Sequence, residues 1–124
     1  MAVTISTEIK KAVIKQVDTL TIERIDDQDA DREDLEQFFI VQDPVVVTDQ
    51  GGNDFQGFIQ VDCINKNRNL YSLTDMVDIV LNLLSRIQII SAAYSILFFS
   101  GSSAVVDKQH EACTFNFIAV NCDS

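Results

Sequence analysis

The chain has 124 residues, a length typical of one domain, and it carries 9 basic and 19 acidic residues for a formal net charge of −10. Nucleic-acid binders gain affinity from basic side chains that displace counterions from phosphates, and anionic membranes attract the same side chains. The charge therefore argues against both partners. An acidic surface is still compatible with DNA that passes nearby without being held, because like charges repel.

No targeting or membrane segment is predicted. Residues 1–9 have neither a basic start nor an apolar stretch with a cleavage site. The longest apolar region, residues 87–99, is interrupted by polar side chains and is too short to span a bilayer. We therefore expect a protein that is made in the cytoplasm and has no membrane partner.

The cysteines predict buried free thiols. Cys63, Cys113 and Cys122 are widely spaced, and each lies in an apolar run. An odd number without paired spacing is not typical of a disulfide framework, and no Cys-x-x-Cys knuckle for structural zinc is present. We expect no metal and no cofactor.

An amphipathic helix is predicted near the N-terminus, because Ile5, Ile9, Val13 and Val17 recur at four-residue spacing. The residues that follow, 19–25, are mostly β-branched or apolar, which favours an extended segment.

Segment 26–36 is a charge run that should form a surface loop, because it cannot bury enough apolar area to order itself. We expect this acidic loop to face a partner or the lumen of an assembly. Its alternating acids imitate the start of a calcium-binding loop, but Arg32 stands where glycine is needed and Phe38 where the final acid is needed. The acidic residues of the loop are Asp26, Asp27, Asp29, Asp31, Glu33, Asp34 and Glu36.

A β-hairpin is predicted from residues 37–48, a turn at 49–54 and a second strand at 55–64. Pro44 lacks an N–H, so its part of the first strand should lie at a sheet edge, bulge or bend. Alternation in the second strand predicts two faces. One face holds Phe55, Gly57, Ile59, Val61 and Cys63, and the other holds Gln56, Gln60 and Asp62.

A second helix is predicted over residues 72–86, with Ser72 and Asp75 as a capping-box-like start. Its polar stripe is narrow, so the helix should be buried on more than one side, against its own sheet and against a neighbouring subunit. We assign the subunit interface to Val77, Leu81, Leu84 and Phe58.

The last two strands are predicted at residues 87–99 and 111–120, joined through Gly101–Ser103 and Asp107–Gln109. In the final strand Ile118 and Val120 lie opposite the buried-type face, so both faces are partly apolar and offer a further contact surface. The whole chain, residues 1–124, is predicted to be one α+β domain. It should have an antiparallel sheet of about four to five strands with two helices packed on one face.

No catalytic arrangement is predicted. The single histidine, His110, is three residues from Cys113 at a strand start, a separation that does not bring the two side chains together. No Gly-x-Ser-x-Gly, phosphate-binding loop or Gly-x-Gly-x-x-Gly is present. We therefore expect a protein that is not an enzyme.

The run Gly57-Phe58-Ile59-Gln60-Val61-Asp62 is followed by a polar loop and by a helix with Asp75 and Asp78 near its start. This arrangement resembles the tail terminator, or tail completion, proteins of long-tailed bacteriophages. The resemblance implies a homohexameric ring in the virion tail or neck. Such a ring caps the tail tube, stops its polymerisation, contacts the tail tube protein and the neck or connector protein, and lets DNA pass.

Two alternatives stay open. The chain is either another neck or tail-tube component, or a small acidic adaptor or inhibitor that binds a basic partner. The size of the species in solution distinguishes assembly proteins from adaptors. A ring or tube former should give a large or concentration-dependent species, and an adaptor should not.

Overall fold

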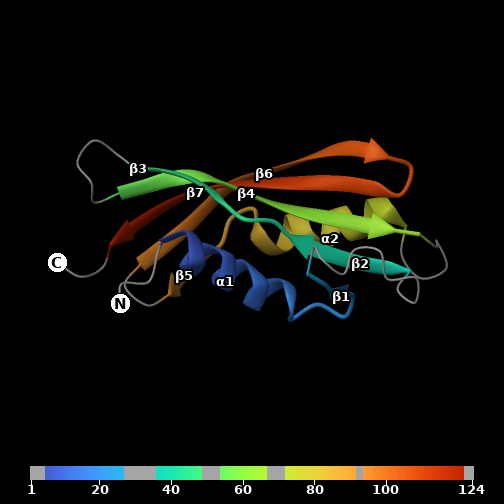
Figure 1. The fold of residues 1–124 in the computed structure, drawn as a ribbon, viewed down its shortest axis with the longest axis horizontal. Coiled ribbons are helices and arrows are strands. Elements are labelled where there is room, and N and C mark those ends of the chain that lie inside the picture. Colours follow the sequence, from blue (N-terminus) through green and yellow to red (C-terminus); the bar gives the residue numbers. More distant parts are fainter. Residues whose placement is uncertain (1–4, 27–35, 49–53, 67–71, 92–93, 122–124) are drawn as a thin grey trace.

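The computed structural model describes residues 5–26, 36–48, 54–66, 72–91 and 94–121 (Figure 1). Two helices and seven strands follow one another along these residues. In chain order they are α1 (Ile5–Val17), β1 (Glu23–Arg24), β2 (Gln37–Val41), β3 (Val45–Thr48), β4 (Asp54–Asn65), α2 (Leu73–Leu84), β5 (Gln88–Ser91), β6 (Tyr94–Asp107) and β7 (His110–Asn121).

The strands form one sheet in the order β1-β2-β4-β7-β6-β5, with β3 also paired to β4. The α+β class is confirmed, but the predicted sheet was wrong in two respects. It has seven strands rather than four to five, and it is mixed because β1 runs parallel to β2. A parallel pair needs a long connection between its strands, which the acidic segment supplies.

The extra strands come from breaks inside predicted ones. Residues 42–44 separate β2 from β3, as expected of Pro44, and both strands pair antiparallel with β4. The run 87–99 likewise contains β5 and the beginning of β6. The predicted turn at Gly101–Ser103 was wrong, since β6 continues through it to Asp107 and pairs with β7. Nonlocal pairing here overrides the weak strand preference of glycine and serine.

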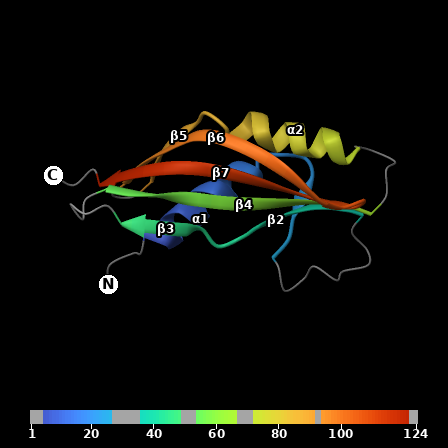
Figure 2. The same ribbon diagram turned by 90° about the horizontal axis from the view of Figure 1, so that it is seen from above.

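Both helices pack against the same face of the curved sheet, which we call the inner face (Figures 1 and 2). The predicted stripe of α1 is confirmed, because Ile9, Val13 and Val17 are fully buried. The predicted faces of β4 are confirmed too, with Ile59, Val61 and Cys63 in this core. The largest buried side chains that the neighbouring strands contribute are Phe39, Phe98, Phe115 and Phe117.

The start of α2 is a complete capping box. Ser72 Oγ accepts a hydrogen bond from the backbone N–H of Asp75 at 3.0 Å, and Asp75 Oδ2 accepts from the N–H of Ser72 at 3.4 Å. The predicted cap is therefore confirmed. It satisfies two of the N–H groups that a helix start leaves without partners.

Replacing Ser72 with alanine is expected to lower the free energy of unfolding by about 1 kcal/mol, because the N–H of Asp75 loses its acceptor. Chemical denaturation measures the change. Thr74, an exposed residue in the first turn of α2 that takes no part in the capping box, provides the control. Its replacement with alanine should leave stability unchanged or slightly raised, and equal effects of the two substitutions would contradict the role of the cap.

Candidate assembly surface

The outer face of the sheet, opposite the helices, differs between its two ends. At one end Ile25, Phe38 and Ile40 are buried in a small second cluster with Ile64. At the other end large apolar side chains are exposed. They lie on several strands, and each shows between 40% and 75% of its surface. These side chains are Val45, Val47, Phe58, Ile90, Leu97, Phe99, Ile118 and Val120.

Strand register places these side chains side by side. Across the sheet, Gln56 lies between Val47 of β3 and Ile118 of β7, and Ile118 is the direct partner of Leu97 of β6. The next row pairs Val45 of β3 with Phe58 of β4. Side chains of directly paired residues stand on the same face about 5 Å apart. The eight residues share this face, with Gln56, Asn116 and Ser95 between some of them, and we call the group the outer apolar patch.

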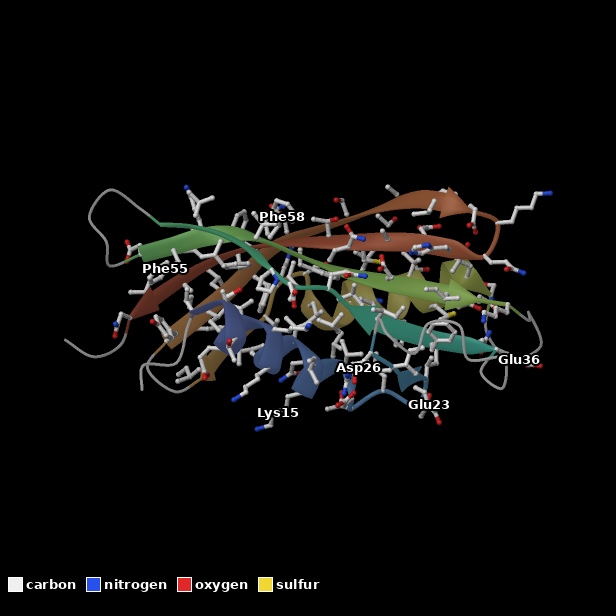
Figure 3. All side chains as sticks on the ribbon, in the orientation of Figure 1. Lys15, Glu23, Asp26, Glu36, Phe55 and Phe58 are labelled. Carbon is white, nitrogen blue, oxygen red and sulfur yellow. The ribbon has the colours of Figure 1, made fainter. Side chains whose placement is uncertain are left out.

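The eight side chains of the outer apolar patch are uncharged, although the chain as a whole carries a net charge of −10 and exposed Asp54 is paired with Val120 on the same face. Figure 3 shows Phe58 on the side of the sheet away from Lys15 of α1. Scattered exposed apolar side chains are common, but a contiguous group on one face typically marks a contact surface. The two-sided pattern of the last strand predicted part of this patch, because Ile118 and Val120 are exposed as expected.

The four residues assigned to a subunit interface lie in different environments. Val77 and Leu84 are 3% and 0% exposed, in the core between α2 and the sheet, and Leu81 is partly buried against the same core. These side chains are already covered by α1 and the sheet of their own chain. Phe58 alone among the four is exposed, and it belongs to the outer apolar patch.

The run Gly57–Asp62 has clear structural roles in β4. A Cβ added at Gly57 would stand 1.9 Å from the backbone oxygen of Val45, so only glycine fits beneath β3. Asp62 is 4% exposed, and its carboxylate accepts hydrogen bonds from Gln42 Nε2 at 2.6 Å and Gln60 Nε2 at 2.7 Å. A buried carboxylate needs such donors to offset its loss of hydration. The motif thus holds β2, β3 and β4 together.

His110 lies beside this carboxylate, with Nε2 3.2 Å from Asp62 Oδ1, and a protonated imidazole would form an ion pair there. Cys113 faces the opposite way. It is buried in the inner core, whereas His110 pairs with Ile64, whose side chain packs in the outer cluster. The sheet therefore separates the thiol from the imidazole, and the two cannot act as a nucleophile and its base.

Cys63 and Cys113 are buried free thiols whose sulfur atoms are 4.0 Å apart. Hydrogen bonding with Cys113 and burial both raise the pKa of the Cys63 thiol far above its ordinary value. The thiol rather than the reactive thiolate is therefore present at neutral pH. The predicted burial is confirmed for these two residues, and Cys122 lies outside the described residues.

Only the ends of the predicted acidic loop are described. Asp26 and Glu36 are exposed, and Asp26 lies 3.4 Å from Arg24. The remaining acids, Asp27, Asp29, Asp31, Glu33 and Asp34, lie outside the described residues. The role of the loop toward a partner or lumen stays a prediction.

Within the described ranges, no three His, Cys, Asp or Glu side chains come together in a way that would hold a metal ion. None of the described helices is both long and apolar enough to cross a bilayer. We take the outer apolar patch as the candidate functional surface because its large apolar side chains are exposed on one face. No protein-family model matches the chain, and no curated protein matches it.

Proposed function

We propose that this chain is a structural assembly protein of a phage virion, a tail terminator that caps the tail tube as a hexameric ring. The ring would stop tube polymerisation and join the tail to the neck or connector. The observation that carries the proposal is the outer apolar patch, which exposes eight large side chains on one face. Burial of such a surface against other subunits is the main driving force of protein association.

The charge distribution supports assembly through this patch. Copies with a net charge of −10 repel one another wherever their acidic surfaces approach. A face whose large exposed side chains are apolar lets two copies or a tube subunit come into contact with few like charges close together. The remaining acidic surface suits a channel for DNA, because a negative wall does not hold the phosphates.

The resemblance carried by Gly57–Asp62 and the start of α2 supplies the phage context. In the chain, this run is the strand that crosses the middle of the sheet, and α2 follows it with its cap at Ser72. The segments that resemble tail terminators are thus central to the fold.

Native mass spectrometry and sedimentation over a range of concentrations test the proposal. We expect a six-fold species, and we expect the added protein to stop elongation of tail tubes. Assembly should strengthen with salt, because salt screens repulsion between acidic copies and favours apolar burial. An acidic adaptor would behave oppositely, since salt weakens its hold on a basic partner. A monomer at every concentration, also beside tail-tube protein, would refute the ring and favour the adaptor.

A further inference from the structure

One edge of the sheet is open along the second half of β6. The short strand β5 pairs with residues 94–97 of β6 and no further. Beyond Phe98, whose N–H bonds to Ile87, β6 has a strand neighbour on its β7 side alone among the described residues (Figure 1). Residues 99–106 of this edge read Phe-Ser-Gly-Ser-Ser-Ala-Val-Val, without a charge or a proline.

The direction of the backbone groups on this edge follows from one hydrogen bond and the register. The N–H of Phe98 donates to the carbonyl of Ile87 at 2.9 Å, so it points away from β7. Backbone groups alternate along a strand, and the bulge between Phe98 and Ser100 shifts the alternation by one residue. The N–H groups of Gly101, Ser103 and Val105 therefore point outward, and those of the residues between them point to β7.

Natural sheets guard an open edge with charged side chains, proline, β-bulges or very short strands. Between its two bulges this edge has neither a charged side chain nor a proline. Here a regular ladder runs from Ser100 to Val105 between two bulges, and its side chains are small or apolar. Val105 is 72% exposed at the far end. Small side chains let another backbone approach closely.

We propose that the open edge of β6 pairs with an edge strand of a second copy of this chain, so that the sheet continues across the subunit boundary. The inference rests on the self-association in the proposed function. It adds that main-chain hydrogen bonds, besides the apolar patch, join the subunits. Neutral edges suit this contact, because the copies are strongly acidic elsewhere.

The strand that fits as the counterpart is β3. A closed ring is head-to-tail, so the β6 edge of one copy must meet the opposite edge of the next. In the described part of the chain, the opposite edge consists of β1 and β3. β1 is two residues long, and its Arg24 is paired with Asp18 at 2.7 Å. β3, Val45–Thr48, is uncharged and follows Pro44.

The register also shows which groups β3 offers. Gln42 donates its N–H to the carbonyl of Gln60 at 2.9 Å, so the backbone groups of Gln60 point toward the β2 and β3 side. By alternation, Phe58 and Gln56 point the same way, and their partners Val45 and Val47 bond to β4. The N–H groups of Val46 and Thr48 are left on the open side.

Residue-resolved amide hydrogen exchange on the full chain tests the pairing, with the assembled species compared with the diluted monomer. We expect hydrogen exchange at the amides of Gly101, Ser103 and Val105 to slow by about 100-fold or more on assembly. Amides inside a paired strand exchange only when the cooperative unit that contains them opens. Exchange at Val46 and Thr48 should slow as well. Amides that already bond to β7, such as that of Ser102, should be protected in both states.

Each of the other outcomes of the exchange experiment would contradict a particular part of the proposal. An assembled species with unchanged exchange on the β6 edge would refute edge pairing and leave the proposed function standing. Protection on β6 without protection on β3 would refute β3 as the counterpart. A chain that stays monomeric would refute both the pairing and the ring.

A proline at Ser103 provides an independent test, because it removes an outward N–H and leaves the ladder to β7 intact. Ser103→Pro should weaken association by about three- to tenfold per subunit boundary, the equivalent of one net hydrogen bond. Ser103→Ala, which keeps the N–H, is the matched control and should associate normally. Equal association of the two folded variants would contradict the pairing, and exchange in the wild-type chain decides the question if the proline variant fails to fold.

Discussion

Replacing Ile118 with lysine is expected to weaken assembly by at least about thirtyfold, as loss of a central interface anchor typically does. Ile118 lies in the middle of the outer apolar patch, between Gln56 and Leu97. A second subunit that covered the patch would have to remove the new ammonium group from water, which costs free energy even beside Asp54. The monomer should stay folded, because Ile118 is already 40% exposed and a lysine stem can lie along the sheet. Sedimentation and circular dichroism measure the two effects.

The charge of the substitution makes the result specific. One lysine changes the net charge from −10 to −9, so increased repulsion between copies cannot explain a loss of assembly. Asn82→Lys adds the same charge to the exposed stripe of α2, on the other side of the sheet, and should assemble normally. If both variants assemble as well as the wild-type chain, the outer apolar patch is not an interface.

The parts of the fold that could be predicted from the sequence are those with a strong local pattern. Three such patterns each lie within a few neighbouring residues and predict their own structure. They are the four-residue spacing in α1, the alternation in β4 and the Ser72–Asp75 cap. The number of strands could not be read in this way. Gly101–Ser103 has the composition of a turn, and only the twelve-residue strand β7 beside it makes it a strand.

The candidate assembly surface was predicted only in part, because an apolar sequence pattern does not say what covers the apolar face. The wide apolar surface of α2 indicated burial on more than one side, but its buried residues, Met76, Val77, Val80 and Leu84, lie on one face of the helix. Contact of α2 with a neighbouring subunit stays a prediction. The sequence pattern cannot say whether an apolar face is covered by the same chain or by another subunit. For Val77 and Leu84 the cover is the chain's own sheet and α1. In β7, alternate residues face opposite sides, so apolar residues on both faces pointed correctly to an exposed apolar surface at Ile118 and Val120.

Replacing Gly57 with alanine is expected to have the largest effect on stability, about 3 kcal/mol, near the upper end for overpacking of a filled site. The added Cβ would lie 1.9 Å from the oxygen and 2.9 Å from the carbon of the Val45 carbonyl. These are backbone atoms, so they can move only if β3 shifts away from β4. For a chain of this length the loss corresponds to a fall of roughly 10 °C in the melting temperature, measured by calorimetry.

Gly101→Ala is the matched control for this substitution, because it makes the same chemical change in another strand of the sheet. Its Cβ would meet Ser85 Oγ, the end of a side chain that can rotate, at 2.7 Å, and the buried Phe115 ring at 2.9 Å, and it would meet no backbone atom as close as the carbonyl of Val45 is to Gly57. The cost should therefore be smaller, about 1 kcal/mol. Equal costs would contradict the close approach of β3 to Gly57.

Displacement of β3 should also weaken assembly, because β3 carries Val45 and Val47 of the outer apolar patch. The glycine of the Gly57–Asp62 run thus links the stability of the fold to the surface through which we propose that it assembles.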